Sequence, residues 1–274
     1  MKERVKDYMA YLEQEEKSKA TRRQYERDIL YFLKYAEGQE ITRELVLRYK
    51  EKLQAEHRAS SVNAKLAALN GFFSYLERGD LRVKRLRVQK RPFLSREKEL
   101  TKAEYLHLLK TAKHRKNEKL RLILETICGT GIRVSELKYI TAEAVYEGEA
   151  AIRLKGKIRV ILIAGKLRKS LRQYLRKNKI SSGPVFVTRY GNPLDRSNIW
   201  KMMKSLCKDA GIAQQKVFPH NLRHLFARCF YEIDKDIARL ADILGHSSID
   251  TTRIYTMSTD REPRRHIDAL GLVL

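Results

Sequence analysis

The chain contains few of the features that mark secreted or membrane proteins. Its three cysteines, Cys128, Cys207 and Cys229, are odd in number and widely spaced, so they form neither a disulfide framework nor a CxxC metal pair. No run of about 18 uncharged apolar residues occurs, which argues against a membrane span. The N-terminal stretch MKERVKDYMAYLEQEEKSKA is charged throughout and lacks the apolar centre of a secretory signal. We therefore expect a protein of the reducing cytoplasm.

The chain is also short of acidic residues. Lys and Arg total 58 against 33 Asp and Glu, which gives a formal net charge of +25 and a pI of about 10.0. Such an excess favours a polyanionic partner, because each phosphate that a cation neutralises releases condensed counterions. A solubilising surface, an anionic membrane and an acidic protein are the alternatives. A balanced mixture of charges would serve solubility equally well, so the charge favours nucleic acid.

The length and composition allow two domains with separate cores. Apolar residues make up 43% of the 274 residues, which argues against wholesale disorder. Residues 1–82 show helical periodicity in four successive segments and are expected to form a helical DNA-binding domain. Residues 83–97 are strongly basic, with little helical period before Pro92, and are typical of a linker; a merely solvated connector is the alternative. A second domain is expected at 98–274.

The second domain is expected to be mostly helical with one small antiparallel sheet. In "AAIRLKGKIRVILIAG", two apolar runs flank Lys155-Gly156-Lys157, and the glycine permits the positive φ of a tight hairpin turn. Helical periodicity returns after this segment. Neither internal repeats nor low-complexity tracts interrupt the chain. The predicted fold class is mainly α with a small antiparallel sheet, in two domains.

Two segments of the second domain carry side chains suited to holding a phosphate. In "GTGIRVSEL", Arg133 follows two glycines at a predicted helix start, where free N–H groups favour anions, and Glu136 lies three residues on. A purely structural Arg133–Glu136 pair is the alternative. In "PHNLRHLFA", His220, Arg223 and His224 are spaced to share one helix face.

The two histidines of this segment also have the i, i+4 spacing of a zinc-binding helix. The metalloprotease pattern needs Glu directly after the first histidine, and Asn221 stands there instead. No third ligand of suitable spacing is apparent. We expect no metal and no cofactor; histidines that only cap or pack a helix are the simpler alternative.

The remaining candidates are Lys155 or Lys157 at the hairpin turn, with His246 and Tyr255 in the polar stretch "ILGHSSIDTTRIYT". A phenol has a pKa of about 10, so it is a poor nucleophile near neutral pH unless cations and a base lie nearby. Two arginines can clamp a phosphodiester and stabilise the charge that builds on a pentacoordinate phosphorus. A lysine can protonate the departing sugar oxygen, although a surface lysine is usually just solvated.

The order Arg, Lys, His-x-x-Arg, His, Tyr, with "GTGIRVSEL", "HNLRH" and "LGHSSIDTTRIY" in their local contexts, resembles the tyrosine recombinase (phage-integrase) family, particularly its compact Xer-type members. The resemblance covers nearly the whole chain. It implies a helical, SAM-like core-binding domain and a mostly helical catalytic domain. It also implies site-specific DNA cleavage and rejoining through a 3′-phosphotyrosyl intermediate and a Holliday junction, without ATP or metal.

The same resemblance implies a role for each residue of the set. Arg133 and Arg223 would grip the scissile phosphate, and Tyr255 would attack it. His220 would assist proton transfer at Tyr255, and His246 would donate a hydrogen bond to the phosphate.

Three further residues complete the implied site. Lys155 is the expected general acid for the departing 5′-hydroxyl. The hairpin reads "LKGKIR" where the family often has G-K-G-x-K-x-R, with Leu154 in place of the first glycine, so Lys157 stays open as the alternative. Glu136 would support the site, and His224 would buttress it.

The implied partner is double-stranded DNA with a specific recombination site. Four protomers would hold two duplexes and exchange a C-terminal helix carrying Ile267, Leu270 and Val273; a monomer packing its own tail is the alternative. Accessory proteins are not identifiable from the sequence. A type IB topoisomerase-like activity and a catalytically silent DNA-binding protein are the rival functions. Helix-borne candidates for DNA contact, any of which could be merely solvated, are Arg22, Arg23, Lys65 and Arg196.

Overall fold

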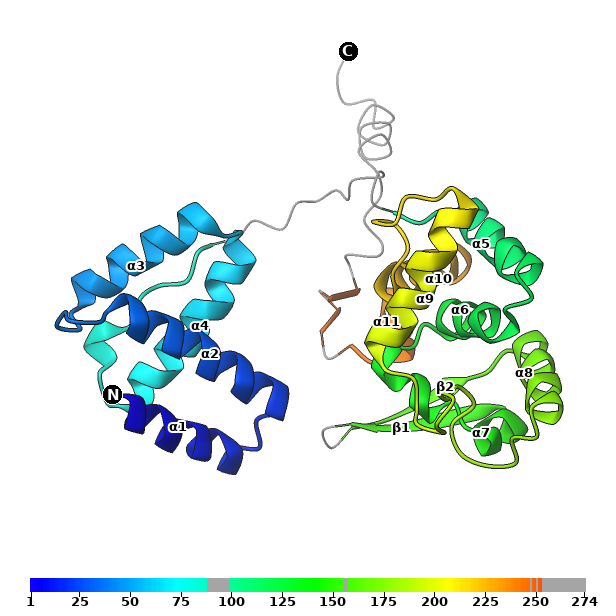
Figure 1. Cartoon of the computed structure of the whole chain (residues 1–274), viewed down its shortest axis with the longest axis horizontal. Coiled ribbons are helices and arrows are strands. Elements are labelled where there is room, and N and C mark those ends of the chain that lie inside the picture. The colour runs from blue at the N-terminus through cyan, green and yellow to red at the C-terminus, as the bar shows by residue number, and fades with distance from the viewer. Residues whose placement is uncertain (88–98, 155–156, 247, 250, 253–274) are drawn as a thin grey trace, which may run out of the picture. The chain divides into compact units, whose positions relative to one another are not determined.

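The computed structural model describes residues 1–87, 99–154, 157–246, 248–249 and 251–252, with the backbone alone at 2, 153, 154 and 157. Contacts divide the chain into two compact units, Met1–Arg91 and Pro92–Leu274. Within the described part, every helix is too short or too polar to cross a membrane. Figure 1 shows a first unit built only of helices and a second unit of helices with one hairpin, as predicted.

The first unit contains four helices and one 3-10 turn: α1 (Lys2–Gln14), α2 (Lys19–Tyr35), α3 (Arg43–Glu56), α4 (Ala59–Tyr75) and η1 (Gly79–Leu81). Side-chain hydroxyls begin two of the helices, since Ser18 caps α2 and Thr42 caps α3. The core is rich in aromatic rings, with Phe32 packing edge-on against Phe73 at a centroid distance of 5.8 Å. The apolar faces of the helices therefore meet in one interior.

The beginning of the expected linker lies along α4. The side-chain amide of Asn70 donates to Val83 O at 2.8 Å and accepts from Val83 N at 3.0 Å. Earlier on the same helix, Asn63 makes the same pair of bonds with Leu86, at 2.9 and 2.7 Å. Val83 is buried in the core of the first unit. After η1, residues 83–86 are therefore held against α4, because the side-chain amides of the two asparagines bond to both the N–H and the C=O of Val83 and of Leu86.

The second unit contains two strands among its helices. In chain order the elements are α5 (Lys102–His114), α6 (Glu118–Thr130), η3 (Val134–Tyr139), α7 (Ala142–Glu147), β1 (Glu149–Leu154), β2 (Lys157–Leu162), α8 (Gly165–Lys177), α9 (Arg196–Ala210), α10 (Pro219–Asp234) and α11 (Ile237–Leu244). The strands pair antiparallel, from Glu149 opposite Leu162 to Leu154 opposite Lys157, which confirms the predicted hairpin.

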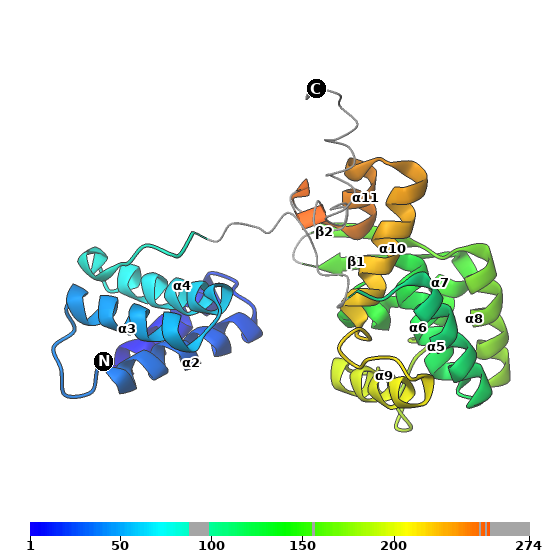
Figure 2. The same ribbon diagram turned by 90° about the horizontal axis from the view of Figure 1, so that it is seen from above.

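Helix α6 is the centre of the second unit. Its apolar residues are buried on several sides, against α5, α8 and α10. Helix α11 lies beside β2, at the end of the unit away from α8 (Figures 1 and 2). The C-terminal ends of α6 and α11 and the start of η3 meet at this end, which is where the candidate residues gather.

Candidate active site

Helix α6 ends in a turn that only glycine fits. Gly131 has φ +65°, and a Cβ there would lie 2.4 Å from the Phe226 ring. The turn places Arg133 at the start of η3. The backbone N–H of Arg133 donates to Glu136 Oε2 at 2.8 Å, and its Nη1 donates to Oε1 at 3.0 Å. The Arg133–Glu136 pair that the sequence suggested is therefore present, with the Glu136 carboxylate buried.

Arg223 enters the same place from α10. Only 1% of this residue is exposed. Its Nη1 donates to Gly131 O at 2.6 Å, and its Nη2 donates to Leu244 O at 2.7 Å. The same Nη2 lies 2.8 Å from His246 Nε2. One guanidinium therefore joins the end of α6, the end of α11 and a candidate histidine.

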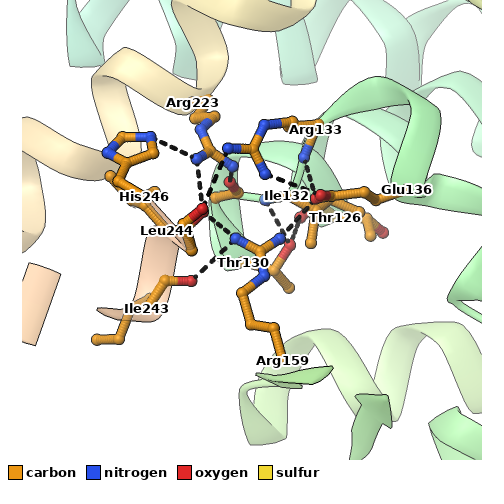
Figure 3. Close-up of polar contacts among 12 residues, drawn as sticks. Thr126, Thr130, Ile132, Arg133, Glu136, Arg159, Arg223, Ile243, Leu244 and His246 are labelled. Atoms are coloured by element: carbon orange, nitrogen blue, oxygen red, sulfur yellow. Dashed lines mark hydrogen bonds and ion pairs between the residues drawn. The ribbon is translucent and has the colours of Figure 1, made fainter. Parts of the chain in front are cut away.

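The C-terminal end of α11 is the common contact of the cluster. The last carbonyls of a helix have no intrahelical donor and carry partial negative charge, so they attract cations. Arg223 binds the carbonyl of Leu244, and Arg133 Nη2 donates to Gly245 O at 3.3 Å. Figure 3 shows the guanidiniums of Arg133, Arg159 and Arg223 gathered around this helix end. The structure thus brings residues 133, 223 and 246 together, although they are far apart in sequence.

Arg159 was missed by the sequence analysis. It projects from β2, where its Nη2 donates to Glu136 Oε2 at 2.5 Å. Its Nη1 donates to Ile243 O at 3.3 Å and to Leu244 O. In β2, Ile158 and Val160 are exposed while Arg159 and Ile161 face inward, and an arginine on the inward face of a strand needs buried acceptors. The sequence does not show which face is buried, because both faces of β2 carry apolar residues. The available signal was the final arginine of "LKGKIR", which matches the arginine that ends the family's G-K-G-x-K-x-R pattern.

His246 is held as a neutral ring. A guanidinium can only donate, so the 2.8 Å contact with Arg223 makes Nε2 an acceptor and leaves the proton on Nδ1. Nδ1 lies 2.8 Å from the hydroxyl of Thr252, which is buried. Burial lowers the pKa of His246 to about 4, and the charges of Arg223 and Arg133 act in the same direction. In this arrangement His246 is uncharged near neutral pH.

The other two candidate histidines, His220 and His224, lie on α10. Their ring centroids are 5.7 Å apart, as the i, i+4 spacing predicted. Desolvation lowers the pKa of His220, followed by the charges of Arg223, Arg133 and Arg196. Burial lowers the pKa of His224 to about 4. Arg196, exposed at the first position of α9, is thus near enough to His220 to act on it electrostatically.

The DNA-contact candidates of the first unit differ in their surroundings. Arg22 is bound to Glu13 at 2.7 Å. Lys65 lies 3.3 Å from the buried carboxylate of Asp28. Arg23 is exposed on α2. Two of the three are therefore engaged in ion pairs within their own unit.

Three predicted residues have side chains outside the described part of the chain. Lys155 and Tyr255 lie outside the described residues, and Lys157 is described only by its backbone. The predicted C-terminal helix, with Ile267, Leu270 and Val273, also lies outside them. The described side chains contain no group of three or more His, Cys, Asp or Glu arranged to hold a metal ion.

The family is shown by comparison with known proteins. Residues 98–262 match the phage integrase family, and residues 5–79 match the N-terminal SAM-like domain of phage integrases. The chain belongs to the phage integrase family, in the class of tyrosine-type site-specific recombinases.

Individual relatives agree with this class over nearly the full length. Tyrosine recombinase XerA of Pyrococcus furiosus is 33% identical over 277 residues, which are 98% of this chain and 94% of the relative. Tyrosine recombinase XerD of Halalkalibacterium halodurans is 33% identical and covers 90% of each chain. A crystal structure of XerA recombinase matches 99% of both chains at 27% identity, with a TM-score of 0.55. XerH bound to palindromic difH matches 91% of this chain and 79% of that one at 21% identity, with a TM-score of 0.73, a likeness of fold.

Proposed function

We propose that this recombinase cleaves and rejoins DNA strands at a specific site through a 3′-phosphotyrosyl intermediate, with Tyr255 as the nucleophile. The observation that carries the proposal is the meeting of Arg133, Arg223 and His246 at the end of α11. Arg133 and Arg159 bind the one buried carboxylate there, while Arg223 binds main-chain carbonyls, so three guanidiniums face a single carboxylate charge and the cluster is suited to an added anion. A DNA phosphate is the anion that the family membership and the net charge of +25 both favour.

In the proposed reaction, Arg133 and Arg223 bind the non-bridging oxygens of the scissile phosphate. The Tyr255 oxygen forms a bond to phosphorus, and the bond to the 5′ oxygen breaks. His220 accepts the phenol proton, and Lys155 gives a proton to the departing 5′ oxygen. The fixed cations accelerate this step because they bind the more highly charged pentacoordinate state more tightly than the diester. Lys157 is the alternative acid.

Supporting residues keep these groups in place. Glu136 orients Arg133, and His224, neutral and packed behind His220, buttresses that ring. His246 accepts from Arg223 without DNA. To donate to a phosphate through Nε2 it must move or gain a proton there, and the phosphate's negative charge favours the protonated ring.

The rejoining step requires no ATP. One phosphodiester linkage is exchanged for another, so a 5′-hydroxyl from a second duplex can displace Tyr255 at little cost in bond energy. Four protomers would hold two duplexes, and paired exchange would pass through a Holliday junction. Neither step assigns a task to a metal or other cofactor. Solved relatives include a lambda integrase dimer bound to a core site, which supports a DNA-bound assembly of this kind.

An apolar groove on the second unit supports exchange of the C-terminal segment between protomers. It has a volume of about 280 Å³ and lies between α5 and α10. Its apolar walls include Tyr105, Leu106, Leu225, Phe226, Phe230 and Ile233. The tail sequence offers three apolar residues at helical spacing, Ile267, Leu270 and Val273, and the same residues of a neighbouring copy would fill such a groove.

The proposed division of labour follows the domains expected from the sequence. Residues 1–82 would bind the core DNA, residues 83–97 would link the domains, and residues 98–274 would catalyse. The protein would act in the cytoplasm of a bacterial or archaeal cell, on nucleoid DNA.

A nicked suicide duplex tests the proposed reaction. The wild-type chain is expected to become attached to DNA in a form that survives denaturing electrophoresis, and Tyr255→Phe is expected to lose attachment while still binding the site. Mixing two duplexes that share the site should give junctions. Attachment without junctions would indicate a topoisomerase-like enzyme, and binding without attachment a silent DNA-binding protein.

A further inference from the structure

Strand β2 reaches the candidate site through one side chain. Arg159 has 12% of its side chain exposed, whereas Arg133 in the same cluster has 39% exposed. Both terminal nitrogens of Arg159 point into the protein (Figure 3). It is therefore poorly placed to meet DNA itself, although it carries the charge that a phosphate would attract.

The contacts of Arg159 connect two of the proposed phosphate ligands. Through Glu136 it is linked to Arg133, because both guanidiniums bind the same carboxylate. Through Leu244 O it is linked to Arg223, because both donate to the same carbonyl. The backbone of α11 also continues directly from Leu244 to His246. Arg159 is thus linked to Arg133, Arg223 and His246, the three described residues proposed to bind the phosphate.

The fit between Arg159 and the helix end is close. Gly245 has φ +63°, and a Cβ added there would lie 2.5 Å from Arg159 Cδ. Glycine is required at this position both by the left-handed backbone and by the neighbouring arginine. The local sequence of α11 is therefore matched to a side chain 86 positions earlier.

We propose that Arg159 is a positioning residue for strand cleavage, which holds the C-terminal end of α11, with His246, against the Glu136–Arg133 pair. The inference rests on the proposed function. Without Arg159, the helix end loses two hydrogen bonds and Glu136 keeps only one guanidinium. The phosphate ligands then lose their common support. Small displacements of reacting groups cost on the order of 10²-fold in rate.

The chain contains a matched control for this role. Arg168 on α8 caps the C-terminal end of α7, where its Nε donates to Val145 O at 3.0 Å and its Nη2 to Tyr146 O. A glycine with positive φ, Gly148, lies against Arg168 just as Gly245 lies against Arg159. Both arginines cap a helix end, but the contacts of Arg168 do not include the candidate site. Substitution of Arg168 therefore measures the effect of losing a helix cap on stability, without a change at the candidate site.

The experiment compares substitutions at both positions in the full-length chain. Arg159→Gln and Arg168→Gln are assayed for covalent attachment to the suicide duplex, for affinity to that duplex and for thermal unfolding. We expect Arg159→Gln to slow attachment about 10²-fold with duplex affinity changed less than about threefold. Arg168→Gln should attach within about threefold of wild type, with a comparable drop in Tm.

Two further measurements separate positioning from stability. Arg159→Lys keeps the charge but cannot reach Glu136 and both carbonyls together, so its rate should fall between those of wild type and Arg159→Gln. Loss of a nearby positive charge should also raise the pKa of His246 in Arg159→Gln, because the charge of Arg159 is one of those that lower it, and NMR titration of the ring measures this. Arg168→Gln should leave the pKa of His246 unchanged.

The inference is overturned if Arg159→Gln attaches at the wild-type rate, if Arg168→Gln loses as much, or if the pKa of His246 does not rise in Arg159→Gln. If Arg159→Gln does not fold, the Arg159→Lys and Arg168→Lys pair decides: Arg159→Lys should attach more slowly than Arg168→Lys at similar duplex affinity, and equal rates overturn the inference. Failure of the proposed function is a different result, in which the wild-type chain itself forms no attachment.

Discussion

The two compact units bury charge in different ways. In the first unit, the buried carboxylate of Asp28 binds the Gln24 amide at 2.6 Å and Lys65 at 3.3 Å, with Arg27 at 3.8 Å. In the second unit, the buried Arg223 donates to main-chain carbonyls and contacts a neutral His246. The first interior compensates its own charge, which is what stability requires. The second concentrates positive charge at one helix end, which prepares that place for an anion.

Substitution of the two buried charged residues, Arg223 and Asp28, should give the largest difference between the two units. Arg223→Gln is expected to slow covalent attachment to the suicide duplex by about 10³-fold, because a donor to the developing charge is lost. Asp28→Asn should change the attachment rate little but lower the free energy of unfolding by about 2 kcal/mol, because Lys65 loses its buried partner. Attachment rates and chemical denaturation of both variants give the measurement. A slow Asp28→Asn enzyme at full duplex occupancy would contradict the contrast.

Acid should weaken the second unit before the first. The pKa values of His246 and His224 are lowered from 6.5 to about 4, so near pH 5 the unfolded chain binds more protons than the folded one. The stability that they contribute is therefore present above pH 6.5 and is lost as the pH falls toward 4. The first unit contains a single histidine, His57.

Amide hydrogen exchange of the whole chain measures this difference, by comparing peptides from α6 and α10 with peptides from α2 and α4 at pH 7 and pH 5. Protection is expected to fall more in α6 and α10. His224→Gln serves as the control, since it removes one of the rings with a lowered pKa and should reduce the pH dependence. Equal loss of protection in both units would contradict the prediction.

Local patterns in the sequence were enough to predict the helices and strands and part of the candidate site. Helical and strand periodicities depend on neighbouring residues, so the four N-terminal helices and the hairpin were predictable. Arg133 with Glu136, and His220 with Arg223, are each three positions apart, a spacing at which geometry follows from the helix itself.

The residues that the sequence missed depend on contacts between distant segments. Arg159 matters because α11, more than eighty positions later in the chain, ends beside β2. The sequence made Arg22 and Lys65 candidates for DNA contact because it does not show their ion-pair partners. Those partners come from other helices: Glu13 from α1 binds Arg22, and Asp28 from α2 binds Lys65. No periodicity reveals such pairs. The roles of Lys155 and Tyr255 stay predictions.

Inorganic phosphate should stabilise the second unit alone. An anion that binds the folded cluster raises the free energy of unfolding by RT ln(1 + [L]/Kd), about 1.4 kcal/mol at ten times Kd. Hydrogen exchange in phosphate and in chloride at equal ionic strength should show added protection at 131–136 and 243–246, and none in α2. Arg223→Gln should lose the protection. Protection spread evenly over both units would indicate general ionic effects instead of a site.

The smallest expected effects concern single surface cations. Arg23 and Arg22 are neighbours on α2, but Arg22 is bound to Glu13 at 2.7 Å whereas Arg23 is exposed. If an arginine that is already paired with a carboxylate contacts DNA less than an exposed one, Arg23 should make a phosphate contact. Arg23→Gln should then reduce the slope of log affinity against log salt by about 0.9, the value for one phosphate. Arg22→Gln should reduce it by less, and Arg196→Gln in the second unit should match Arg23→Gln.

Titrations of a duplex with and without the recombination site measure these slopes, and the reductions should be the same on both, because phosphate contacts carry no sequence information. An Arg22→Gln slope as reduced as that of Arg23→Gln would mean that DNA displaces Glu13 from its partner. In that case the ion pairs of the first unit are exchanged for phosphates on binding, and the contrast between the two units holds only for the DNA-free protein.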